Sequence, residues 1–298
     1  MAPFPSPTSA FHSTTYPSLS PTRPELSAKG KSILITGGGT GIGSETALYF
    51  AKAGASRLAL LGRREQPLLD TKASIQQQFP SIEIFTAPTD VTNKGQVDAA
   101  FAKFAGSGKI DVVVSNAAVR GPMETVRDVD TDEFLAAVDT NIRGSFYVAK
   151  ATLAHGAKDA VVIEVNSAAA HLNMAPGGLT AYSASKLAVF RLWDSLGFAN
   201  PDMSVFHTHP GIVDTDMNKD AGGVKAFGYE DHASLPASFH VWLASPEAKF
   251  LKGKFLYVNW DVDELKAQAK DIESGNKFDI GLVGWPFGDD NWKLTAEF

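Results

Sequence analysis

SILITGGGTGIG, at residues 32–43, joins a short β-branched run to a glycine-rich turn and then to the start of a helical pattern. Glycine tolerates the backbone angles of a tight strand-to-helix turn and lets a phosphate approach bare backbone. The free N–H groups and positive dipole end of the following helix favour an anion there. Because both flanking elements are present, the stretch predicts a dinucleotide-binding turn and not a plain flexible one. The expected cofactor contacts in it are Gly37, Gly39, Thr40, Gly41, Ile42 and Gly43.

From Lys31 onward, short β-rich runs alternate with longer helical patterns, which is typical of βαβ units. The strand runs are apolar on both faces, as in a parallel sheet covered by helices on both sides. The sequence therefore predicts an α/β fold, a single Rossmann-type doubly wound domain with a seven-stranded parallel sheet. The expected strands are residues 32–36, 57–61, 83–86, 110–114, 160–165, 204–208 and 254–258, and the expected helices are residues 42–53, 66–79, 93–105, 131–154, 181–197 and 232–244.

The composition excludes several classes of partner and site. The chain has 298 residues, 44% of them hydrophobic, and 27 Lys+Arg against 33 Asp+Glu give a net charge of −6. This mild acidity makes no case for nucleic acid or an anionic membrane as a partner. There is no Cys, so disulfides, thiolate metal sites and Cys nucleophiles are excluded. No apolar run approaches the roughly 18 residues of a membrane span, and no secretory signal pattern is present. A cytoplasmic protein is expected.

The ends of the chain differ from its middle. Residues 1–30 are rich in Pro, Ser and Thr and predict an extended or disordered arm. Residues 31–270 predict the Rossmann-type domain, with an irregular, glycine-containing substrate loop at 214–235. Residues 271–298 predict a tail that packs on the domain or on a neighbouring subunit. The charges of Asp261–Glu264 and Lys266–Lys270 are interpreted as a solvated helix face.

The residues after the second strand bear on the choice of cofactor. A carboxylate at that point would bind the ribose 2′-hydroxyl and select NAD. Here the sequence reads Leu-Gly-Arg-Arg at residues 61–64, and guanidinium groups suit a 2′-phosphate. Arg63 and Arg64 therefore favour NADP(H), with Arg63 the stronger candidate. The alternative is that both are solvated charges on a loop.

Tyr182 and Lys186 are the candidate reaction centre. They stand four residues apart at the start of a predicted helix and therefore share one face. A free phenol holds its proton too tightly for transfer at neutral pH, and a nearby ammonium favours the phenolate. Ser167 follows a buried strand, at the edge of the sheet where ligands bind in such folds. It is therefore placed to hydrogen-bond a substrate oxygen.

Taken together and in order, these pieces resemble the short-chain dehydrogenase/reductase family over residues 31–258. The matching pieces are the glycine turn, Asp90-Val91, Asn116-Ala117-Ala118, Asn141, Ser167, Tyr182 with Lys186, and Pro210-Gly211 leading to Thr215. The arm and tail are similar to a fungal subgroup found in specialised metabolism. The resemblance implies a nicotinamide cofactor, a small-molecule substrate, and a homodimer or homotetramer paired through the helices at 131–154 and 181–197.

The resemblance also implies a role for each residue. Tyr182 would act as general acid or base, with Lys186 holding the nicotinamide ribose. Ser167 would orient the carbonyl or alcohol, and Asn141 would anchor a water of the proton relay. Contacts with the adenosine and nicotinamide ends of the cofactor would come from Asp90, Val91, Asn116, Ala117, Pro210, Gly211, Val213 and Thr215.

The substrate side departs from the family pattern. The separation of Ser167 from Tyr182 is longer than is usual, which predicts an altered pocket. His171, Asn173 and Met174 in the added length, and Met217 in the loop, are expected to touch substrate. His207 and His209 lack an evident third ligand, so no metal site is expected.

The function expected from the sequence is an NADP(H)-dependent oxidoreductase, a ketone or aldehyde reductase or an alcohol dehydrogenase, acting on a mid-sized, largely apolar molecule. One alternative is a redox-neutral isomerase, dehydratase or cyclase on the same scaffold in a natural-product pathway. Another is a non-catalytic NADP-binding sensor, which would not need a proton relay.

Overall fold

The computed structural model describes residues 4–173, 178–219, 224 and 228–282. Its centre is a seven-stranded sheet in the order β3-β2-β1-β4-β5-β6-β7, and every neighbouring pair is parallel. The predicted doubly wound fold is confirmed. The strands are β1 (Ser32–Thr36), β2 (Arg57–Gly62), β3 (Glu83–Pro88), β4 (Ile110–Ser115), β5 (Gly156–Val165), β6 (Ser204–His209) and β7 (Phe255–Tyr257).

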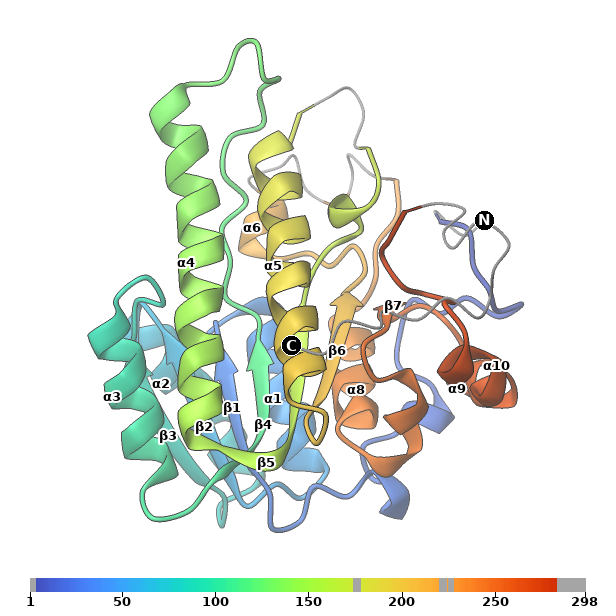
Figure 1. The fold of residues 1–298 in the computed structure, drawn as a ribbon. Helices are drawn as coiled ribbons and strands as arrows, with labels where there is room; N and C mark the ends of the chain where they lie inside the picture. The colour runs from blue at the N-terminus through green and yellow to red at the C-terminus, as the bar shows by residue number, and fades with distance from the viewer. Residues whose placement is uncertain (1–3, 174–177, 220–223, 225–227, 283–298) are drawn as a thin grey trace.

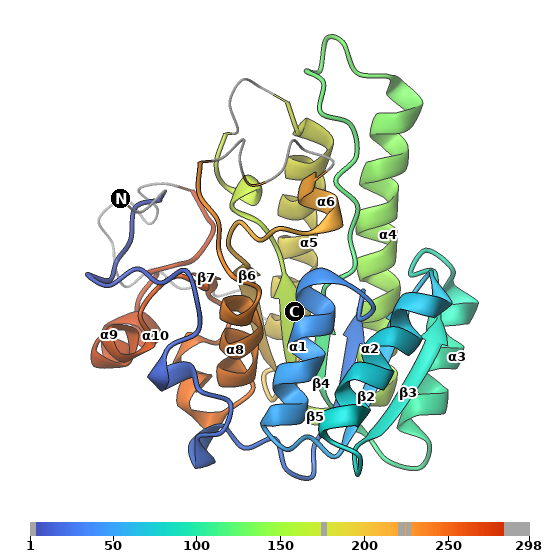
Figure 2. The same ribbon diagram turned by 180° about the vertical axis from the view of Figure 1, so that it is seen from behind.

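Helices cover both faces of the sheet. The face turned toward the viewer in Figure 1 carries α3, α4 and α5, and the opposite face in Figure 2 carries α1, α2 and α8. Alternation along β1 explains the two layers, because Ile33 and Ile35 enter one hydrophobic cluster and Leu34 enters the other. The helices are α1 (Gly41–Lys52), α2 (Glu65–Gln78), α3 (Lys94–Ala105), α4 (Thr131–His155), α5 (Thr180–Ala199), α6 (Asp216–Lys219), α8 (Ser234–Leu243), α9 (Val262–Ala267) and α10 (Ala269–Ser274).

The junction of α4 and β5 differs from the sequence expectation. The strand begins at Gly156, directly after the helix ends at His155, whereas the apolar pattern placed its start at Ala160. The first strand residues include the exposed Lys158 and Asp159, so hydrophobicity does not mark them. Backbone pairing of Gly156 with Ile110 on β4 extends the strand instead. None of the described helices is both long enough and apolar enough to cross a bilayer.

Residues 4–30 lie along the side of the domain formed by α8 and α9 (Figure 2). Leu19 and Leu26, at the ends of two short 3-10 helices, are completely or almost completely buried. The Glu264 carboxylate accepts hydrogen bonds from the backbone N–H groups of Ser9 at 2.7 Å and Ala10 at 2.9 Å. The solvated face predicted for the charges at residues 261–264 and 266–270 is therefore correct for Asp263 and Lys270, which are exposed, but not for Asp261 and Glu264, which bind the arm.

Candidate active site

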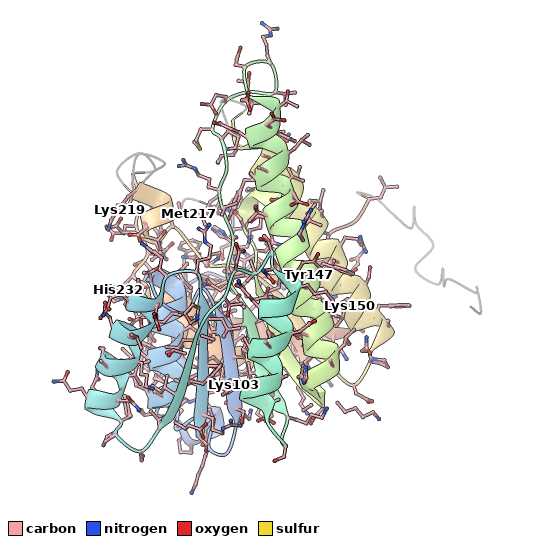
Figure 3. The ribbon with its side chains drawn as sticks, turned by 90° about the vertical axis from the view of Figure 1, so that its left-hand side faces the viewer. Lys103, Tyr147, Lys150, Met217, Lys219 and His232 are labelled. Carbon is pink, nitrogen blue, oxygen red and sulfur yellow. The ribbon has the colours of Figure 1, made fainter. Side chains whose placement is uncertain are left out.

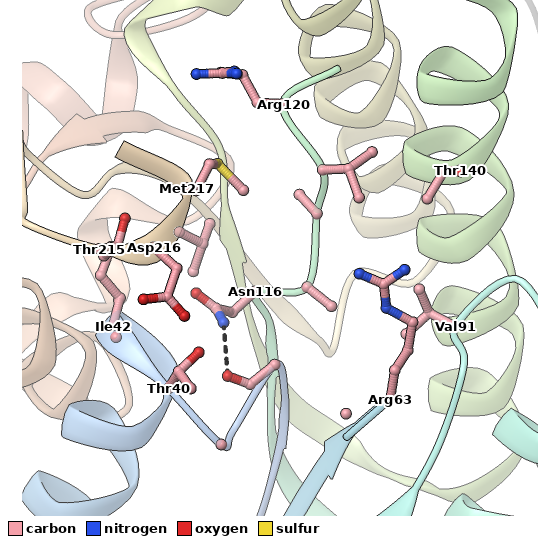
Figure 4. Close-up of a pocket in the computed structure, with 18 of the residues that line it drawn as sticks. Thr40, Ile42, Arg63, Val91, Asn116, Arg120, Thr140, Thr215, Asp216 and Met217 are labelled. Carbon is pink, nitrogen blue, oxygen red and sulfur yellow. Dashed lines mark hydrogen bonds between the residues drawn. The ribbon is translucent and has the colours of Figure 1, made fainter. Parts of the chain in front are cut away.

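A cavity of about 540 Å³ lies at the carboxyl ends of the central strands. It extends from the glycine turn and the end of β2, past the segment after β4, to the start of α5 and to α6 (Figure 4). Figure 3 shows α6, with Met217 and Lys219, standing beyond the ends of the strands. The predicted site residues that line the cavity are Gly37, Gly39, Thr40, Gly41, Ile42, Arg63, Arg64, Asp90, Val91, Asn116, Ala117, Tyr182, Lys186, Pro210, Thr215 and Met217.

The glycine turn is packed too closely for side chains. Gly37 has φ of 69°, and a Cβ there would lie 2.6 Å from Asn116 Nδ2. Gly43 does not line the cavity, but a Cβ on it would lie 2.1 Å from the Gly37 carbonyl oxygen. The Asn116 amide in turn donates to the Thr36 carbonyl at 2.9 Å. The turn therefore leaves bare backbone and the N-terminus of α1 facing the cavity, which is the setting an anion requires.

Two arginines border the cavity at the end of β2. Arg64 Nη2 lies 3.5 Å from the Asp216 carboxylate of α6. Arg63 forms no ion pair within the described residues. Hydrogen bonds from the backbone N–H and hydroxyl of Thr92 lower the pKa of Asp90, and the positive charge of Arg63 adds a smaller effect in the same direction. This end of the cavity thus keeps one uncommitted guanidinium for an anionic ligand.

Tyr182 and Lys186 lie together in the first turns of α5. The ammonium nitrogen of Lys186 is 5.6 Å from the centre of the Tyr182 ring and donates a 2.6 Å hydrogen bond to the Val165 carbonyl. Lys186 is only 4% exposed, so its charge sits where water contributes little screening. An ammonium has three donors, and no other hydrogen bond of it is formed within the described residues. The remaining N–H groups can serve a ligand in the cavity.

Asn141 on α4 is buried behind this pair. Its side chain donates to the Val119 carbonyl and accepts from the Val119 N–H, each at 2.8 Å, and donates to the Ser185 hydroxyl at 2.9 Å. The Ser185 hydroxyl in turn donates a hydrogen bond to the Tyr182 carbonyl. Both amide hydrogens of Asn141 are therefore used to hold the chain after β4 against the start of α5, and the proton-relay role stays a prediction.

The end of β5 is held by a buried polar network. Asn166 lines the cavity, and its side-chain amide donates to both oxygens of Glu164 and to the Lys186 carbonyl. Glu164 is 1% exposed and also lies 3.1 Å from Nδ1 of His207. Ser167 follows directly and accepts from the Ala169 N–H as the cap of a short 3-10 helix. Ser167 is not part of the cavity lining, although Val165 and Asn166 before it are.

Other predicted site residues lie apart from the cavity. The Nε2 atom of His171 is 2.8 Å from the Tyr257 hydroxyl, so its ring faces β7, and burial lowers its pKa. Asn173 is exposed and outside the lining, and Met174 lies outside the described residues. Gly211 and Val213 are outside the cavity lining. A Cβ on Gly211 would lie 2.5 Å from the Asp231 carboxylate, and Val213 forms an isolated parallel β-bridge with Asp231.

The sequence interpretation missed Arg120, Thr140, Asn166 and Asp216, all of which line the cavity. Thr140, Asn166 and Asp216 each adjoin a predicted site residue, and that adjacency was the available signal. Arg120 lies in the segment after β4, and no neighbouring residue indicates that it belongs to the site. Within the described part of the chain, no group of three or more His, Asp or Glu residues could hold a metal ion.

Comparisons with known proteins identify the family. The family model described as short chain dehydrogenase matches residues 31–223. Short chain dehydrogenase/reductase AacuD of Aspergillus aculeatus is 34% identical, over 93% of this chain and 96% of that protein. Short chain dehydrogenase citE of Monascus ruber is 31% identical, over 92% of this chain and 96% of that protein.

Solved structures share the fold. Levodione reductase superposes with a TM-score of 0.72 at 23% identity, covering 81% of this chain and 98% of its own. A short chain dehydrogenase of Burkholderia cenocepacia, solved in complex with NADP, has a TM-score of 0.71 at 24% identity and covers 79% of this chain and 99% of its own.

Proposed function

The chain belongs to the short-chain dehydrogenase/reductase family, and from that we propose that it is an NADP(H)-dependent oxidoreductase that interconverts a carbonyl compound and an alcohol. The observation that carries the proposal is one cavity with the glycine turn and Arg63 at one end and Tyr182 with Lys186 in its wall. A cofactor and a substrate could meet there beside a proton donor.

The residues present fit nicotinamide adenine dinucleotide phosphate. The bare turn and the start of α1 would take the pyrophosphate, because a side chain at Gly37 has no room and the helix N–H groups are free. Arg63 would bind the 2′-phosphate, since it has no carboxylate partner in the described structure. The Burkholderia cenocepacia structure, which shares the fold, holds NADP and supports this choice.

When bound, the cofactor supplies or accepts the hydride. The hydroxyl of Tyr182 would give its proton to the carbonyl oxygen in reduction and take it back in oxidation. The buried ammonium of Lys186, fixed by the Val165 carbonyl, would favour the phenolate and donate its free N–H groups to the ribose. Ser167 would orient the substrate oxygen from the end of β5, where the buried Asn166 network keeps the backbone in place.

The substrate we propose is a mid-sized molecule with a largely apolar body. Met217 on α6 lines the cavity, and Val119 lies in the segment after β4. The fungal relatives support a role in natural-product biosynthesis. We propose that the protein acts in the cytoplasm. The redox-neutral alternative predicts turnover of substrate without stoichiometric consumption of reduced cofactor.

The test is the Tyr182→Phe variant, followed by the absorbance of reduced cofactor with a panel of ketones and aldehydes. We expect at least a hundredfold loss of kcat with the Kd for NADPH unchanged, because only the proton donor is removed. Tyr147→Phe on α4, outside the cavity lining, is the matched control and should keep full activity (Figure 3). Full activity in Tyr182→Phe would contradict the proposal.

We further propose a homodimer or homotetramer formed through α4 and α5. Several large apolar side chains on these two helices are exposed, namely Leu135, Phe146, Leu153, Leu187 and Phe198. Exposed apolar residues grouped on adjacent helices are typical of subunit interfaces. Light scattering of the eluted protein should give a multiple of the 31.7 kDa chain, and Phe146→Asp should lower that mass. A monomeric wild-type protein would exclude this assembly.

A further inference from the structure

Arg120 lies in the cavity wall with its charge unpaired. It follows Val119 in the chain after β4, and Figure 4 shows its guanidinium above Met217, at the opposite end of the cavity from Thr40 and the glycine turn. Its Nη1 atom is buried without a hydrogen-bond partner, and its Nε makes a 3.4 Å contact with the adjacent Gly121 carbonyl. Across the residues that the structure describes, no carboxylate lies within ion-pair distance of it.

The acidic residues in the described lining are engaged elsewhere. Asp216 faces Arg64, and Asp90 accepts two hydrogen bonds from Thr92. The protein itself therefore supplies no counter-charge for Arg120 from these side chains. A partly buried guanidinium with an unsatisfied N–H group is costly unless an anion completes it.

The backbone on both sides of Arg120 is fixed. Asn141 binds both the N–H and the carbonyl of Val119 at 2.8 Å. Gly121 is packed so closely that a Cβ there would lie 2.5 Å from the Ala137 Cβ on α4 and 3.9 Å from the Ala181 Cβ. Since Ala181 immediately precedes Tyr182, the segment that carries Arg120 passes beside the reaction centre. The guanidinium is thus held on the substrate side and not at the adenosine end.

We propose that Arg120 binds a carboxylate on the substrate, so that the enzyme acts on carbonyl compounds, or the corresponding alcohols, that carry an acid group away from the reacting carbon. A guanidinium matches a carboxylate bidentately, which would fix the orientation of an otherwise apolar molecule. The pyrophosphate and 2′-phosphate of the cofactor have their own sites at the glycine turn and Arg63, at the other end of the cavity. The inference rests on the proposed oxidoreductase function for the identity of the ligand as substrate.

Binding to the enzyme–NADP⁺ complex tests this without requiring turnover. The probes are aryl and alkyl keto acids, including 4-acetylbenzoate, each paired with its methyl ester, and the readout is Kd by calorimetry. We expect at least one acid to bind about tenfold or more tightly than its ester, and Arg120→Met to abolish that preference. The Kd for NADP⁺ should stay within twofold. Arg143→Met, an exposed arginine of α4 paired with Asp139, is the matched control and should change neither value.

Any other binding result overturns the inference. No acid-over-ester preference across the panel in the wild-type protein would exclude a carboxylate site. A preference that survives in Arg120→Met would place the anion elsewhere, and a loss of NADP⁺ affinity with the preference retained would assign the guanidinium to the cofactor. If the acid preference depends on Arg120 but no keto acid consumes NADPH, the anion site stands and the oxidoreductase function fails.

Discussion

Arg64 Nη2 lies 3.5 Å from the carboxylate of Asp216, so an ion pair joins the loop after β2 to α6 across the edge of the cavity. Both side chains are about two-thirds exposed, so the pair contributes little to stability. The pair instead affects which arginine is available to bind a ligand. The pair occupies one of the two adjacent arginines, whereas Arg63 has no such partner in the described structure.

The two arginines should therefore differ in their effect on cofactor choice. Arg63→Ala should raise the KM for NADPH at least tenfold and leave the KM for NADH within about twofold, because the lost contact is charge-assisted and specific to the 2′-phosphate. Arg64→Ala should have a smaller effect. Steady-state kinetics with both cofactors measure this, and an equal loss for NADPH and NADH in Arg63→Ala would contradict the assignment.

Glu164 should be important for stability although it does not reach the cavity. Its carboxylate satisfies the buried amide of Asn166 and lies 3.1 Å from His207. Glu164→Ala should cost about 3 kcal/mol in the free energy of unfolding, because it strands buried polar partners. Urea denaturation gives this value. Combining it with His207→Phe should cost less than the sum of the single changes, and strict additivity would argue against a shared network.

Asp231 gives a pH dependence to stability. Burial raises its pKa from 3.8 to about 6, although hydrogen bonds from the Ile212 N–H, Tyr229 and Asn259 oppose the shift. The folded state thus binds this proton more tightly than the unfolded state. The contribution to stability is full below about pH 4, falls as the pH rises toward 6, and is constant above it.

The Asp231→Asn variant checks this dependence. The melting temperature of the wild-type protein minus that of the variant should fall between pH 4 and pH 6.5, by an amount equivalent to about 3 kcal/mol at most. Asp271→Asn, an exposed residue of α10, is the control and should give a flat difference. A flat difference for Asp231→Asn as well would show that this carboxyl titrates normally.

Glu264 should fasten the N-terminal segment. Its two carboxylate oxygens accept from the backbone N–H groups of Ser9 and Ala10, and these bonds lower its pKa. Glu264→Ala should make chymotrypsin cleavage after Phe11, the residue that follows Ala10, several-fold faster, because the segment opens more often. Glu273→Ala on α10 is the control for the loss of an acidic residue. Equal cleavage rates in the wild type and Glu264→Ala would show that other contacts suffice.

The sequence by itself determined the fold and predicted the glycine turn and the Tyr182–Lys186 pair, both of which line the cavity. Strand runs that are apolar at successive positions indicate a sheet buried on both faces. The glycines at 37 and 43 fit a turn with no room for a Cβ. Tyr182 and Lys186 are brought together by helical spacing, which is local. Local spacing and burial patterns are readable because they depend on residues close together in the chain.

Only the tertiary structure decided which side chains face the cavity across elements. It turned His171 toward Tyr257, brought Glu264 to the backbone of the N-terminal segment, and left Arg120 unpaired in the wall. No sequence pattern predicts these outcomes. Each depends on the position of residues that lie on a different element, and for His171 and Glu264 these are more than 80 positions away in the chain. The residues predicted to touch substrate, His171 and Asn173, depend on such long-range neighbours, and the structure places both outside the cavity lining.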